Sequence, residues 1–68
     1  MATVTQRVAA RIVEIRRMRG MTQETLAAKA QLHRVSLVTI ERGRKQPTLD
    51  TLDRIARALR VTLVDLVK

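Results

Sequence analysis

Apolar residues along the chain recur at the spacing of helix faces, and no stretch alternates with the period of a half-buried strand. The first apolar stripe consists of Val8, Ile12, Ile15 and Arg19. This spacing places all of them on one side of a helix, where the long arginine side chain keeps its charge in water. We expect Thr5 to cap the start of this helix and Gly20, which tolerates a positive φ, to end it.

Further helical segments follow, separated by glycine, proline or polar turns. The second starts after Thr22, the third runs from about Arg34 to Arg42, the fourth starts after Thr48 and a short fifth starts after Thr62. Their inner faces are expected to comprise Leu26, Ala27, Ala30, Leu37, Ile40, Leu49, Leu52, Ile55, Ala56 and Leu59. The pattern predicts an all-α fold, a compact five-helix domain over residues 1–68 in which the helices over 49–67 complete the core.

The composition excludes several kinds of site. The chain has no cysteine and no aromatic residue, and His33 is its one histidine. Disulfides and thiolate metal sites are therefore excluded, and neither a histidine-rich metal site nor a Ser-His-Asp triad can be assembled in the usual way. The sequence also has no glycine-rich phosphate loop. We expect a protein that is not an enzyme and that binds no cofactor or metal.

The net charge of +8 is high for 68 residues and favours a polyanionic partner, either nucleic acid or an anionic membrane surface. The alternative is a solvated basic surface without a partner. No stretch is long and apolar enough to cross a bilayer, and we expect a cytoplasmic location. Residues 1–19 are rich in arginine and poor in acids, as transit peptides are. Because the remaining residues would form too small a core alone, we expect a structural helix there instead.

The second and third predicted helices are joined by a short turn, and Ala27 is small enough to let them cross at a steep angle. A helical wheel places Leu37 and Ile40 of the third helix on its inner side. The outward side comprises Val35, Val38, Thr39 and Arg42. Arginine binds guanine edges and apolar groups contact thymine methyls, so this side is suited to the DNA major groove. An ordinary surface helix explains the same residues equally well.

Three runs of residues occur in order along the chain: MTQETLA at 21–27, TIERG at 39–43 and PTLDTL at 47–52. Together they resemble the phage repressor and Cro family of helix-turn-helix regulators, the Xre type, over residues 8–66. The resemblance implies a five-helix fold with the motif at about residues 23–42. It also implies sequence-specific binding of double-stranded DNA, as a homodimer on a palindromic operator. In its shortness the chain is similar to the single-domain members, including controller proteins of restriction-modification systems.

The resemblance also implies which residues contact DNA. Base contacts are expected from Arg34, Val35, Ser36, Val38 and Thr39. Phosphate contacts are expected from Gln23, His33, Arg42, Arg44 and Lys45. For Arg34 we expect a bidentate contact to guanine, with a phosphate contact as the alternative. For Gln23 and His33 the alternatives are a plain surface glutamine and a partly exposed turn residue.

Two further features come from comparison with the family pattern. In the family, the positions of Arg16 and Glu41 carry an ion pair that holds the first helix against the recognition helix, so we expect a structural pair and not two solvated charges. Gln31 and Arg60 stand where the family usually has glycine. If the backbone keeps a positive φ at these positions, each side chain adds strain of about 1 kcal/mol.

The C-terminal end is more apolar than one short helix can bury. Val61, Val64 and Val67 are candidates for a homodimer interface, and the alternative is that they only close the core. The leading function is a sequence-specific transcriptional regulator. One alternative is an antitoxin that binds a partner protein and controls its own operon, and another is a basic membrane-surface or non-specific nucleic-acid protein. A toxin or RNA polymerase is the protein partner these functions suggest.

Overall fold

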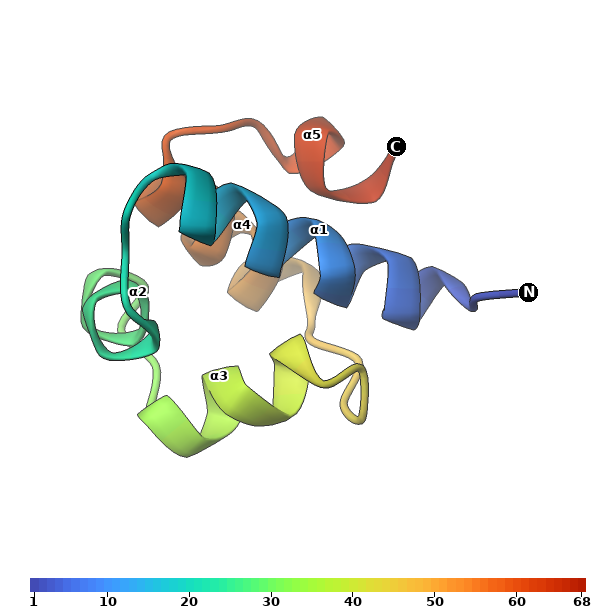
Figure 1. The fold of residues 1–68 in the computed structure, drawn as a ribbon, viewed down its shortest axis with the longest axis horizontal. Helices are drawn as coiled ribbons and strands as arrows, with labels where there is room; N and C mark the ends of the chain where they lie inside the picture. The colour runs from blue at the N-terminus through green and yellow to red at the C-terminus, as the bar shows by residue number, and fades with distance from the viewer.

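Helices account for most of the computed structural model, which describes all residues from Met1 to Lys68 (Figure 1). The elements are α1 Val4–Met18, α2 Gln23–Lys29, α3 Arg34–Glu41, α4 Leu49–Leu59 and α5 Leu63–Val67. Helix α1 crosses the middle of the molecule, with α3 on one side of it, α5 on the other and α4 behind (Figure 1). The predicted all-α, five-helix fold is confirmed.

A core of aliphatic side chains lies where the helices meet, since the chain has no aromatic residue to fill it. The largest fully buried side chains are Ile12, Leu26, Leu37, Ile55, Leu59 and Leu66. Every helix contributes at least one of them, and each contributes about 1.5–3 kcal/mol when removed from water. The core therefore fixes α3 from its inner side and leaves its outer side free.

Most helix starts are capped by threonine, as the sequence predicts. The hydroxyls of Thr22, Thr48 and Thr62 each accept from the backbone N–H of the third residue along. The predicted cap of α1 at Thr5 is wrong, because the cap is Thr3. Its hydroxyl accepts from the Gln6 N–H at 3.1 Å, and Gln6 Oε1 accepts from the Thr3 N–H at 3.0 Å. This reciprocal capping box moves the start of the helix towards the N-terminus.

Two residues other than glycine adopt the left-handed backbone conformation that normally favours glycine. Gln31, in the turn between α2 and α3, has φ +58°, and Arg60, which ends α4, has φ +61°. Each occupies a position where the family pattern usually has glycine. The steric conflict between Cβ and the following carbonyl is therefore present at both sites.

Replacing Gln31 with glycine is expected to raise the free energy of unfolding by on the order of 1 kcal/mol, because the strain disappears while the turn keeps its shape. For a domain of this size each kcal/mol corresponds to about 4–8 °C in melting temperature. Gln46→Gly is the matched control, since Gln46 is an exposed loop residue without a positive φ. A fall in the melting temperature of Gln31→Gly would contradict the strain argument.

Helix α5 is only five residues long and depends on its cap and on α1. Asp65 Oδ2 accepts from the Thr62 N–H at 2.9 Å, and the Arg11 Nε–H donates to the Asp65 carbonyl at 3.1 Å. Hydrogen bonds from Thr62 lower the pKa of Asp65 below its usual value of 3.8. The bond from the Thr62 backbone has the largest effect, and the bond from its side chain has the next largest. The charged carboxylate is thus the form that stabilises this end of the fold.

Because the pKa of Asp65 is lowered by folding, its contribution to stability is present above pH 3.8 and is lost as the pH falls through the folded-state pKa. Asp65→Asn should therefore melt below the wild type near neutral pH. The difference in melting temperature should shrink as the pH is lowered from about 5 towards about 2. Thermal melts followed by circular dichroism measure both, and a difference independent of pH would contradict the prediction.

Candidate nucleic-acid interface

Helices α2 and α3 meet at a steep angle. Figure 1 shows this, since α2 is seen nearly end-on in the view that shows α3 lengthwise. The close approach depends on Ala27, which is 3% exposed, and on Leu26 and Leu37, which are fully buried beside it. The turn between the helices includes Gln31 with its positive φ. The geometry is that of a helix-turn-helix, with α3 at the edge of the molecule.

The outer side of α3 consists of residues predicted to contact bases. Arg34 and Val35 are exposed, and Val35 keeps 77% of its surface. Ser36, Val38 and Thr39 are half-buried. The Thr39 hydroxyl donates to the Val35 carbonyl at 2.9 Å, so its methyl group and oxygen lone pairs remain available to a partner. At Arg34 and Val35 this side of the helix is therefore open to solvent.

Basic side chains continue from the end of α3 into the loop before α4. Arg42, Arg44 and Lys45 are exposed, and none of them belongs to any of the four salt bridges of the structure. Acidic residues therefore do not neutralise this edge of the molecule. Three unpaired cations next to an exposed helix face attract a polyanion such as a DNA backbone.

The start of α2 and the start of α3 border a shared polar hollow of about 280 Å3. Its lining comprises Thr22, Gln23, Glu24 and Arg34. Arg34 thus lies beside the predicted phosphate-binding Gln23 and not apart from it. His33 occupies the N-cap of α3, is exposed and makes no side-chain capping bond, so its ring is free.

The structure brings Arg16 of α1 and Glu41 of α3 together in a bidentate pair. Arg16 Nε lies 2.7 Å from Glu41 Oε2, and Arg16 Nη2 lies 3.1 Å from Oε1. The two side chains are only 10% and 4% exposed. Arg16 Nη1 also donates to the Met21 carbonyl at 2.9 Å, which ties in the turn before α2. The pair holds the end of α3 against the body of the protein.

Gln23 makes a contact that the sequence analysis missed. Its Nε2 donates to Glu41 Oε1 at 3.0 Å, so the predicted phosphate-binding residue touches the buried ion pair. Eighteen residues separate the two in the chain, and no local pattern links them. A glutamine at the first position of a helix gives no sequence signal for such a contact.

The valines near the C-terminus divide into two environments. Val61 is half-buried against the core, whereas Val64 and Val67 are 62% and 41% exposed. Leu49 was expected on the inner face of its helix, and that prediction is wrong because it is 70% exposed. The helical period predicted that the Leu49 side chain would face the core. Leu49 is the first residue of α4, however, and lies beyond the edge of the core. Val4 is also exposed.

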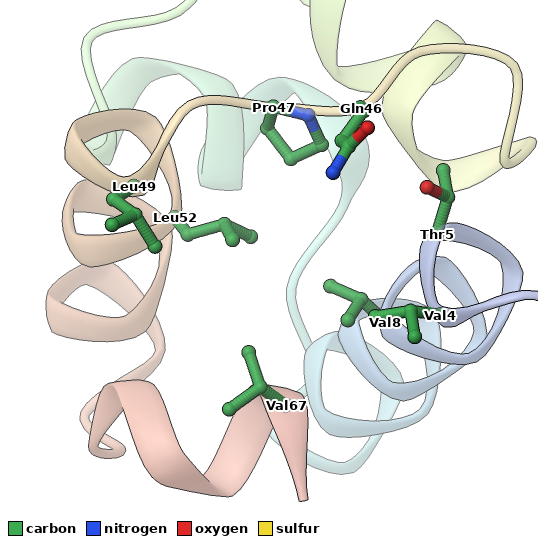
Figure 2. Close-up of a pocket in the computed structure, with 8 residues that line it drawn as sticks. All are labelled: Val4, Thr5, Val8, Gln46, Pro47, Leu49, Leu52 and Val67. Atoms are coloured by element: carbon green, nitrogen blue, oxygen red, sulfur yellow. The ribbon is translucent and has the colours of Figure 1, made fainter.

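An apolar groove of about 440 Å3 lies between the start of α1, the start of α4 and the end of α5 (Figure 2). Its lining comprises Val4, Thr5, Val8, Gln46, Pro47, Leu49, Leu52 and Val67. Figure 2 shows Val67 facing the groove from α5 opposite the leucines of α4. Three of the exposed aliphatic residues, Val4, Leu49 and Val67, therefore lie along one groove.

A helix-turn-helix family model matches residues 12–66, which include all of α2, α3 and α4. The chain belongs to this helix-turn-helix family. Within it, the relatives place the chain in the phage repressor and Cro type that the sequence analysis named. It is a DNA-binding transcriptional regulator and not an enzyme.

Several members of the helix-turn-helix family are similar over most of the chain. An uncharacterised HTH-type transcriptional regulator of Sinorhizobium fredii is 40% identical over 60 residues, 88% of this chain and 78% of that protein. The immunity repressor of Bacillus phage phi105 is 45% identical over 60 residues, but the match spans only 42% of that repressor. The restriction-modification controller protein C.AhdI of Aeromonas hydrophila superimposes with a TM-score of 0.89 at 31% identity, over 91% of this chain and 94% of that protein.

No group of His, Cys, Asp or Glu side chains is placed to hold a metal ion. None of the helices has both the length and the hydropathy that a bilayer-crossing segment needs.

Proposed function

We propose that this regulator binds a palindromic operator as a homodimer, with α3 of each subunit in the major groove. The observation that carries the proposal is the outer side of α3, where Arg34 and Val35 are exposed, while its inner side is held by the core and by the Arg16–Glu41 pair. A helix held rigidly from behind presents its outer side chains to base edges in one register. The cations that follow α3 supply the attraction to the DNA backbone.

Each residue on the outer side of α3 has a role that matches its chemistry. Arg34 donates bidentately to the O6 and N7 atoms of guanine, and Val35 contacts a thymine methyl group. Thr39 contributes its methyl group or accepts from a base amino group, because its proton is held by the Val35 carbonyl. Ser36 and Val38 lie at the margin of this contact.

Phosphates on either side of the groove are bound by residues that flank α3. The residues proposed for this are Gln23, His33, Arg42, Arg44 and Lys45. Charged and polar side chains of this kind fix the position of the protein on the duplex without distinguishing sequences. Arg34 is near enough to Gln23 to clamp a phosphate in the hollow, so that role is its alternative.

We propose that the homodimer forms through the apolar surface around the groove. Val67 and Leu49 line the groove and are exposed. Val64 is exposed on the same short helix as Val67, and Val61, which precedes that helix, is half-buried. A two-fold contact through these residues removes them from water. In such a dimer the two recognition helices lie about 34 Å apart, one turn of DNA.

Selection of bound duplexes from a random pool, at stated salt, tests the proposed function. The expected result is a short palindrome whose half-sites are about one DNA turn apart, bound about 10³-fold or more tighter than bulk DNA. Enrichment of no sequence, or of a motif without two-fold symmetry, would refute sequence-specific binding as a dimer.

Replacing both Val64 and Val67 with lysine is expected to weaken self-association by at least about tenfold, because the interface would have to bury two charges from each subunit. Both side chains are exposed in the monomer, so the fold should persist. Sedimentation velocity measures the change. Val35→Lys, at an exposed valine on α3, is the matched control and should leave self-association unchanged. Unaltered association of the double variant would place the dimer interface elsewhere.

A further inference from the structure

Gln23 and Glu41 form a contact that joins the start of α2 to the end of α3. Glu41 Oε1 accepts both from Gln23 Nε2 at 3.0 Å and from Arg16 Nη2 at 3.1 Å. The Glu41 side chain is 4% exposed, so the carboxylate cannot turn to water. Gln23 is half-buried, and it also lines the polar hollow that Arg34 borders. Gln23 therefore touches the buried ion pair on one side and a solvent-exposed hollow on the other.

The chemistry of the two groups determines how the Gln23 amide is oriented. A carboxylate only accepts hydrogen bonds, so the amide must turn its NH2 group, and not its oxygen, towards Glu41. The planar NH2 group carries a second N–H, which points away from the first. With one N–H donated to Glu41, the same nitrogen still has a donor for an anion.

We propose that Glu41 is a positioning residue for DNA binding: it orients the Gln23 amide so that one nitrogen bridges the carboxylate of α3 and a DNA phosphate. The inference rests on the proposed function, since it names how the Gln23 phosphate contact is held. An amide without Glu41 would rotate between two orientations, and in one of them its oxygen would face the phosphate. The ion pair thus serves the interface as well as the fold.

NMR of the wild-type protein tests the bridge directly. A random-sequence duplex at low salt is the probe, because a phosphate contact does not depend on base sequence. The Gln23 side-chain NH2 signals, assigned with Gln23→Ala, should already be well separated in the free protein. On addition of duplex, the proton that faces away from Glu41 should shift strongly while the proton bound to Glu41 stays in place. Movement of both, or of neither, would overturn the bridge.

Affinity measurements test the positioning role. Arg16→Met combined with Glu41→Leu removes the carboxylate without changing the net charge, and such an apolar replacement of a buried pair is often tolerated. In the wild type, Gln23→Ala should weaken duplex binding about tenfold, the loss of one hydrogen bond to a charged group. In the double-variant background the same change should weaken binding less than about twofold. An equal loss in both backgrounds would overturn the proposal.

Controls separate this proposal from the proposed function. Gln46→Ala removes an exposed glutamine that makes no side-chain hydrogen bond, and it should leave duplex affinity unchanged in both backgrounds. If the double variant fails to fold, the wild-type NMR titration decides alone. If no operator emerges from selection but the bridge and the coupling are present, the proposed function fails and the positioning role of Glu41 stands.

Discussion

Replacing Glu41 with alanine is expected to destabilise the fold by about 3–5 kcal/mol, because it leaves the Arg16 guanidinium buried without its counter-ion. The variant would also leave Gln23 Nε2 without its acceptor. Total stabilities of natural domains are about 5–15 kcal/mol, and one this small is expected at the low end. The variant should therefore be partly or wholly unfolded near body temperature, and urea titration should show the midpoint shift.

Burial of the pair is the cause of this effect, and a second pair in the same chain provides the control. Asp53 Oδ2 lies 3.0 Å from Arg57 Nε, but those side chains are 46% and 80% exposed. Asp53→Ala should cost less than about 1 kcal/mol, because water already screens the attraction. Arg16→Met with Glu41→Leu should recover most of the stability lost in Glu41→Ala. If Glu41→Ala is no more damaging than Asp53→Ala, the buried pair does not hold α3.

Arg34→Ala is expected to reduce discrimination at one operator position by about 1–3 kcal/mol, roughly five- to 150-fold, because no other side chain replaces the bidentate contact to guanine. Affinity for a duplex with that guanine changed should fall much less. Arg44→Ala should instead weaken all sequences alike and flatten the salt dependence by about one unit of slope. Fluorescence anisotropy over a salt series, with the selected operator and its single-base variants, measures both.

Arg34 is exposed, so its replacement should leave the fold intact. Its position beside Gln23 makes a phosphate contact the competing role. A uniform loss of affinity, with discrimination between bases preserved, would assign Arg34 to the backbone and leave base recognition to Val35 and Thr39. A thermal melt of each variant shows whether the protein is still folded, and so distinguishes a loss of binding from unfolding.

Local sequence patterns predicted most of the secondary structure, because helix faces and caps are local properties. The stripe through Ile12 and Ile15, and the caps at Thr48 and Thr62, depend on residues a few positions apart. The cap at Thr5 was wrong although a local signal existed, since Thr3 and Gln6 have the spacing of a capping box. Leu49 was misplaced because periodicity gives a direction on a helix but not how far the neighbouring elements extend.

The sequence by itself determined the five helices, the excess of positive charge and the outward side of α3, because these depend on residue type and local spacing. Only the tertiary structure decided that Gln23 shares Glu41 with Arg16 and that Leu49 joins an apolar groove. These contacts join residues far apart in the chain, and which of them form depends on how the helices pack around the common core.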